Sequence, residues 1–241
     1  MLAKSVRAAL LALPLLIVAC SGSSSADEAQ KGKADAKASS NSVLESNDMI
    51  LGSADAPVTV IEYASVTCPH CADFAENVMP EIKKEFIDTG KVKWVFREFP
   101  TPPQGLSYAG SVLARCAAEK GGTPAFFLIV DTLFRTQRTW VLGKDPKLEL
   151  EKIAAQAGMD DKAFEACIQR QDLVDVVNDN VKKGSERYGI DSTPSFVVNG
   201  EKQQIPHTVE DFQKALSEAV AKATGTVTLE DPSKTSDQPS E

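Results

Sequence analysis

The apolar positions in the first half of the chain predict a strand, a helix and a second strand. Residues 58–64 are β-branched, aromatic or apolar apart from Glu62, which is typical of a buried central strand. Residues 69–88 carry apolar side chains at steps of three and four, so these side chains share one face of a helix. Pro80 lies inside this helix and should kink it, because proline has no amide hydrogen to donate. A glycine ends the helix, and residues 92–99 predict the next strand.

A long stretch with helical spacing follows, and strand character returns only near the end. The predicted helices, including one that closes the fold, cover 106–119, 124–135, 148–157, 162–169, 173–188 and 209–223. Residues 195–198 predict a strand, and the Asn199-Gly200 pair predicts a tight hairpin turn into residues 202–205. This order of elements predicts an α/β protein in which a helical segment, at about 104–188, is inserted before the hairpin.

The N-terminus has the pattern of an export signal. Lys4 and Arg7 precede an apolar run that is too short to span a bilayer as a helix. The run ends in Ile-Val-Ala-Cys20, which resembles the lipobox of bacterial lipoproteins and implies cleavage before a lipidated Cys20. The alternative is ordinary signal cleavage nearby, with Cys20 discarded. We therefore expect a lipoprotein signal peptide at 1–19.

Polar segments flank the part of the chain that can fold. Residues 20–42 contain almost no large apolar side chain and predict a flexible tether, and residues 224–241 predict a disordered tail. The folded body is expected at 43–223. A formal net charge of −8 over 241 residues argues against nucleic acid as a partner, because affinity for phosphates comes largely from lysine and arginine.

Cys68 and Cys71, separated by Pro69-His70, are the main candidates for chemistry. This spacing allows a small disulfide ring or two of four zinc ligands. Zinc would need two more ligands, which the scattered remaining cysteines and His207 do not supply together. Haem attachment needs histidine directly after the second cysteine, and a purely structural disulfide is a further alternative. We expect a redox-active pair without metal or cofactor.

The position of the pair at a helix start explains why it should be reactive. Cys68 caps the predicted helix, Pro69 occupies the first turn, and the sulfur faces unpaired amides at the positive end of the helix dipole. The dipole alone lowers a thiol pKa by about 1, so a larger effect needs hydrogen bonds from the first-turn amides or from the ring of His70. Cys71, one turn deeper, should be shielded and act as the resolving thiol.

The segment from Val60 through Cys68-Pro69-His70-Cys71 to Phe74 resembles the active site of the DsbA family of disulfide oxidoreductases. The resemblance extends over about 48–223 and implies a thioredoxin-like fold with an inserted helical domain. It also implies that Glu62 is a buried acid that exchanges a proton with Cys71; a solvated glutamate at a strand edge is the alternative. The Thr193-Pro194 loop should hold a cis peptide that faces the two sulfurs and pairs with substrate.

The resemblance further implies a function in an exported location. We expect a monomeric oxidase that introduces disulfides into unfolded exported proteins with free thiols and is reoxidised by a DsbB-like, quinone-linked membrane protein. Thr193 is more typical of reductive members of the superfamily, so a disulfide reductase or isomerase is the first alternative. A non-catalytic surface lipoprotein that binds peptides is the second.

Cys116 and Cys167 remain once Cys20, Cys68 and Cys71 are assigned. Two cysteines in an oxidising compartment favour a structural disulfide. Both lie on predicted helices of the insertion beside large apolar residues, which favours a common core. The alternatives are two separate buried thiols or a second redox pair.

Overall fold

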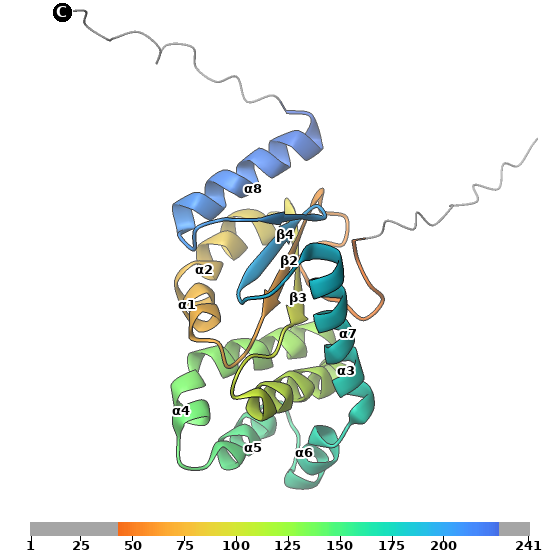
Figure 1. The fold of residues 1–241 in the computed structure, drawn as a ribbon, viewed down its shortest axis with the longest axis vertical. Coiled ribbons are helices and arrows are strands. Elements are labelled where there is room, and N and C mark those ends of the chain that lie inside the picture. The colour runs from red at the N-terminus through yellow and green to blue at the C-terminus, as the bar shows by residue number, and fades with distance from the viewer. Residues whose placement is uncertain (1–42, 227–241) are drawn as a thin grey trace, which may run out of the picture. The chain divides into compact units, whose positions relative to one another are not determined.

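The computed structural model describes residues 43–226, which form a five-stranded mixed sheet and a set of helices around it (Figure 1). The strands are β1 Met49–Leu51, β2 Val58–Ala64, β3 Val92–Glu98, β4 Ser195–Val198 and β5 Glu201–Gln203. They lie in the order β1-β3-β2-β4-β5, in which β2 and β3 are parallel and all other pairs are antiparallel. The predicted signal peptide, tether, lipidated Cys20 and most of the predicted tail lie outside the described residues.

Strand β2 is the centre of the sheet, as its apolar composition predicted. All seven of its residues are buried, and it pairs with β3 on one side and β4 on the other. Because side chains alternate along a strand, Val58, Val60 and Glu62 face one layer of helices, whereas Ile61 and Tyr63 face the opposite layer. Glu62 is therefore not at a strand edge, and its carboxyl group points into the protein.

The helix predicted for residues 69–88 is three consecutive pieces. They are α1 Pro69–Asn77, α2 Met79–Ile82 and a π-helical turn at Lys83–Ile87. The predicted kink is present, but the break falls at Val78, before Pro80, since proline fits the first turn of the new helix. Large apolar side chains from all three pieces pack in one core cluster with the sheet and with α8 Val209–Thr224.

A helical segment connects β3 to β4. Its members are α3 Gln104–Arg135, α4 Gln137–Leu142, α5 Pro146–Gln156, α6 Asp161–Ile168 and α7 Gln171–Tyr188. The two helices predicted before residue 136 run end to end as α3, with a non-helical residue, Gly122, where the prediction placed a boundary (φ 67°, ψ −167°). Helix α4 was not predicted. Figure 1 shows α3 to α6 gathered below the sheet and α7 returning along its second face.

Helix α7 packs closely against this second face. Gly184 lies over the ring of Tyr63, where a β-carbon would come within 2.6 Å of a ring carbon, so the close approach needs glycine. The chain then reaches β4 and turns back at Asn199 and Gly200, which both have positive φ, as the predicted hairpin requires.

Buried ion pairs join the sheet to the surrounding segments. Arg97 of β3 binds Asp48 at 2.8 Å and donates to the hydroxyl of Tyr63 at 2.9 Å. The neighbouring Glu98 accepts from Arg115 of α3 at 2.6 Å and from Asn180 of α7 at 2.7 Å. Glu98 therefore links the sheet to two helices of the inserted segment. Within 43–226, no helix is long and apolar enough to cross a membrane.

Candidate active site

Cys68 lies at the end of the loop between β2 and α1. Its backbone is extended (φ −80°, ψ 121°), and Pro69 follows at the first helical position. The Cys68 amide donates to the Ser65 carbonyl at 3.0 Å, and its carbonyl accepts from Ala72 at 3.2 Å, which fixes the turn. The residue keeps 8% of its surface exposed, against 0% for Cys71. Cys68 is thus the partner that an incoming thiol can reach, although it is less open than a surface thiol.

Hydrogen bonds to the sulfur make Cys68 acidic. Its pKa falls from the ordinary 9.0 to about 5, first because the thiol of Cys71 donates to the sulfur. Burial opposes this effect, while the Thr193 side chain and the amides of Cys71 and His70 add to it. In the thiol form, Cys68 instead donates to the Thr193 carbonyl at 3.4 Å. Cys68 is therefore a thiolate at neutral pH.

Cys71 has the opposite character. Burial raises its pKa above the usual range, and the hydrogen bond to Cys68 and the negative charges of Cys68 and Glu62 add to this rise. Cys71 is accordingly a neutral thiol when Cys68 is ionised. Both thiols are free in the structure, so the described state is the dithiol. The Cys68 sulfur can therefore act as nucleophile or leaving group, and the Cys71 sulfur is its protonated partner.

Glu62 is a buried acid that accepts a hydrogen bond from Trp94. The indole hydrogen of Trp94 is donated to one carboxyl oxygen at 3.0 Å, and within residues 43–226 the other oxygen has no partner. Burial raises the pKa of Glu62 from 4.5 to about 7, and the bond from Trp94 counteracts only part of this effect. The side chain also borders an apolar cavity of about 480 Å³. Glu62 can therefore gain or lose a proton near neutral pH.

The loop at Thr193-Pro194 and the His70 side chain form the outer wall of the site. The Thr193-Pro194 peptide is cis, and the Thr193 carbonyl lies beside the Cys68 sulfur, as described above. A polar pocket of about 530 Å³ opens next to it. Its lining includes His70, Thr193, Pro194, Gln204 and His207, and we call this cavity the polar pocket. His70 is exposed, and its backbone amide, rather than its ring, contributes to the lowered pKa of Cys68.

Sequence reasoning missed several residues that shape the site. Gln137 of the unpredicted helix α4 donates to the carbonyls of Val66 at 2.9 Å and Cys68 at 3.0 Å. Ser65 lies at the centre of a hydroxyl network that reaches Thr67, Ser107 and Thr101 at 2.9 to 3.0 Å. A cluster of hydroxyl residues directly before Cys68 was the only signal in the sequence, and nothing there identified Gln137.

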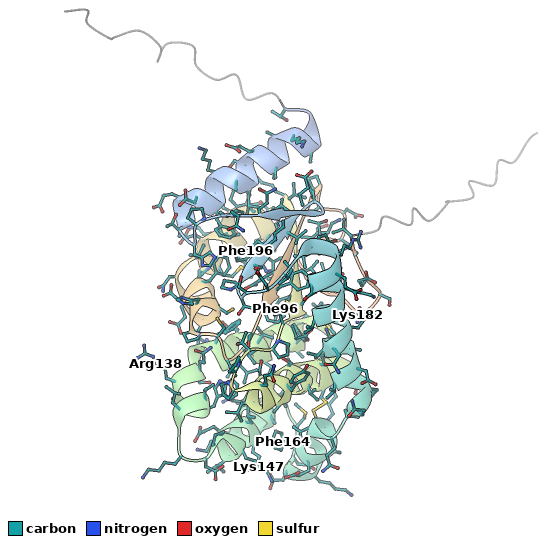
Figure 2. All side chains as sticks on the ribbon, viewed as in Figure 1. Phe96, Arg138, Lys147, Phe164, Lys182 and Phe196 are labelled. Carbon is teal, nitrogen blue, oxygen red and sulfur yellow. A yellow bond between two sulfur atoms is a disulfide. The ribbon has the colours of Figure 1, made fainter. Side chains whose placement is uncertain are left out.

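The other cysteines lie away from this site or outside the described residues. Cys116 of α3 and Cys167 of α6 are joined by a disulfide, with 6.1 Å between their α-carbons. Figure 2 shows this bond in yellow, between helices of the inserted segment. Across the described range, no group of three or more His, Cys, Asp or Glu side chains could hold a metal ion.

Comparison with known proteins identifies the family. Residues 44–218 match the family model described as Thioredoxin. A protein of Rickettsia bellii, provisionally named protein-disulfide oxidoreductase, is 31% identical over 77% of this chain and 70% of its own length. A Rickettsia prowazekii protein with the same type of name is 32% identical, and the match spans 63% of that protein.

Solved structures agree with this assignment. The crystal structure of Wolbachia pipientis alpha-DsbA1 has a TM-score of 0.66 and 30% identity, with coverage of 76% of this chain and 95% of that one. Chlamydia trachomatis DsbA has the same fold, with a TM-score of 0.62 at 20% identity over 76% of this chain and 96% of that one. The predicted α/β class, the thioredoxin-like fold and the resemblance to the DsbA family are confirmed. The chain belongs to the thioredoxin family and, within it, is a DsbA-type thiol-disulfide oxidoreductase.

Proposed function

We propose that this protein is an oxidase that transfers the Cys68–Cys71 disulfide to exported proteins. A substrate thiolate attacks the Cys68 sulfur, the disulfide breaks, and Cys71 leaves. A second substrate thiolate then attacks the substrate sulfur of the mixed disulfide, and Cys68 leaves as a thiolate. The substrate is oxidised to a disulfide and the enzyme is reduced to a dithiol. The acidity of Cys68 carries this proposal, because a stable thiolate is a good leaving group and favours the reduced enzyme.

We assign Glu62 the role of exchanging a proton with Cys71. When Cys71 leaves, its thiolate is buried and needs a proton, because burial penalises the charge. A carboxyl group with a pKa of about 7 beneath the pair can donate that proton and recover it during reoxidation. The indole of Trp94 holds one carboxyl oxygen and leaves the other for the exchange.

Thr193 and Pro194 are assigned the docking of the substrate chain. The Thr193 carbonyl lies next to Cys68 at the edge of the polar pocket, where an extended substrate segment could pair with it. His70 borders the same pocket from α1. Unfolded proteins with free thiols fit this role, because an oxidase must reach cysteines that are later buried. We propose that the protein acts as a monomer.

The redox potential separates an oxidase from the alternative of a reductase. The experiment equilibrates the Cys68–Cys71 pair with mixtures of reduced and oxidised glutathione and counts the protein thiols by mass. An oxidase should have a potential above the glutathione poise of the cytosol, which lies at about −220 to −260 mV by extraction. A potential near that of thioredoxin, about −270 mV, would instead favour the reductive alternative.

The apolar cavity beneath the site supports the second alternative, a lipoprotein that binds peptides without catalysis. Leu51, Phe74, Met79, Phe127 and Phe134 contribute to its walls. Such a protein would use Cys68 and Cys71 structurally. Peptide binding that persists unchanged when both cysteines are alanine, together with no thiol exchange by the native protein, would favour this alternative over the oxidase.

Lipidation of Cys20 is proposed from the lipobox pattern, with residues 1–19 as signal peptide, 20–42 as tether and 43–223 as the folded body. A diacyl group would suffice for stable membrane attachment, because it supplies two chains. The oxidising partner is proposed to be a DsbB-like, quinone-linked membrane protein. Mass spectrometry of the mature N-terminus tests the anchor, and Cys20→Ser should move the protein from the membrane to the soluble fraction.

A further inference from the structure

His207 is a second histidine at the active site, although it lies far from Cys68 in the sequence. It belongs to the loop between β5 and α8. Its ring packs edge-on against Phe74, with ring centres 6.0 Å apart, and against Phe196, with ring centres 5.7 Å apart. These two buried rings also touch each other, with centres 4.9 Å apart. The imidazole is thus held on an aromatic platform.

This platform joins the two segments that carry the chemistry. Phe74 lies on α1, three residues after Cys71, and Phe196 lies on β4, two residues after Pro194. In this position the His207 ring borders the polar pocket, which His70 also lines. Figure 2 shows Phe196 among the side chains between α8 and the sheet. The chain has two histidines, and both line this pocket.

The charges around His207 tie it to the reactive cysteine. Burial lowers the pKa of His207, and the neighbouring His70 adds to this effect. The charges of Asp73 and Cys68, both at the start of α1, act in the opposite direction. His207 shares the polar pocket with Thr193, whose carbonyl lies 3.4 Å from the Cys68 sulfur, so the Cys68 thiolate stabilises an imidazolium at position 207.

Lys202 and Asp211, two charged residues near the loop, have partners of their own. Across the polar pocket, Lys202 donates to the Gly189 carbonyl at 2.7 Å and lies 3.7 Å from Asp191. At the start of α8, Asp211 binds the Thr208 hydroxyl at 2.7 Å. The next acidic residue there is Glu210, which is exposed. The thiolate of Cys68 is the charge near His207 that appears and disappears with the redox state.

We propose that His207 is a positioning residue for the Cys68 thiolate. The His207 imidazolium stabilises that thiolate from the polar pocket, and this couples proton uptake at His207 to reduction of the Cys68–Cys71 disulfide. The disulfide carries no charge, whereas the reduced site carries the thiolate. By reciprocity, reduction must raise the proton affinity of His207 by the same factor by which protonation of His207 favours the thiolate. The inference rests on the proposed role of Cys68 as the reactive thiolate.

The first test follows the two histidines by NMR in oxidised and reduced protein. The His207→Phe variant assigns the signals and keeps an aromatic ring on Phe74 and Phe196. The proton affinity of His207 should be about two- to fivefold higher in the reduced protein, as for other part-exposed ion pairs. A merely structural ring would titrate identically in both states, and that result would overturn the inference.

The second test measures ionisation of Cys68 by the ultraviolet absorbance of its thiolate. His207→Phe should lower the ionisation constant of the Cys68 thiol below about pH 6 by a similar two- to fivefold factor, and should leave the thiolate fraction unchanged well above neutrality, where the imidazole is neutral. Lys214→Gln, which removes a positive charge from the exposed face of α8, is the matched control and should have no effect. An unchanged titration in His207→Phe would overturn the inference. A Cys68 that ionises only at alkaline pH in the native protein would overturn the proposed function itself.

Discussion

Replacement of Glu62 by glutamine should stabilise the protein at alkaline pH and leave its stability nearly unchanged in acid. Glu62 is 3% exposed, and its raised pKa has burial as the main cause. Glutamine has the same shape, keeps an oxygen that can accept from Trp94, and carries no charge at any pH. The variant therefore removes the cost of a buried carboxylate without removing the hydrogen bond.

The size of the effect follows from the two pKa values. Below pH 4.5, Glu62 is protonated in both the folded and the unfolded chain, so its ionisation does not affect stability. Between pH 4.5 and about 7, the unfolded chain releases a proton that the folded chain retains, so the folded state loses stability as the pH rises. Above that range the loss is complete, and it amounts to about 3 kcal/mol at 1.36 kcal/mol per pKa unit.

Urea denaturation at pH 4.5 and pH 8 measures this difference. Both proteins should carry Cys68→Ala and Cys71→Ala, so that no redox change is superposed; the causes of the Glu62 shift involve neither cysteine. The gap in unfolding free energy between the glutamine variant and its parent should widen by about 3 kcal/mol over this range. Glu218→Gln, on the exposed side of α8, is the control and should show no such widening. A constant gap would refute the account of Glu62 as a buried acid with a raised pKa.

Three further predictions concern the cysteines and the loop before α1. Replacing both Cys116 and Cys167 by alanine should cost about 4 kcal/mol of unfolding free energy, because the bridge spans 51 residues; a urea midpoint equal to that of the native protein would contradict this. Alkylation of the reduced protein at about pH 6 should modify Cys68 before Cys71, and peptide mapping that shows the reverse order would count against the assignment. Gln137→Ala should lower the unfolding free energy by about 1 to 3 kcal/mol, since two buried carbonyls lose their donor; denaturation measurements that show no loss would exclude this role.

Local features of the fold could be predicted because they depend on neighbouring residues. The run at residues 58–64 is β-branched, aromatic or apolar apart from Glu62, and it is the buried central strand β2. The Asn199-Gly200 pair tolerates positive φ, and it forms the hairpin turn between β4 and β5. Pro69, directly after the cap residue Cys68, occupies the first-turn position that its chemistry favours.

Features that depend on distant contacts could not be predicted. Strand β1 has only three residues, and its pairing with β3 is what makes it a strand. Helix α4 is six residues long, and the bonds from Gln137 that matter reach about 70 residues back along the chain. The sequence suggested His207 only as a possible zinc ligand, whereas the aromatic packing on α1 and β4 brings it to the site. The fold decides which distant residues become charge and hydrogen-bond partners in a site, and a single sequence does not reveal these long-range contacts.

Thiol transfer by cysteine variants tests the central claim most directly. Oxidised native protein is mixed with a reduced, unfolded protein, and the substrate disulfides formed are counted by mass; the variant lacking Cys116 and Cys167 serves as the control and should retain transfer. Cys68→Ser should transfer none. Cys71→Ser, loaded with glutathione on Cys68 and mixed with a substrate that carries a single thiol, should exchange the glutathione for substrate and accumulate the mixed disulfide, because neither Cys71 nor a second substrate thiol can break it. Full substrate oxidation by Cys68→Ser would contradict the account, since the transferring sulfur would then be another one.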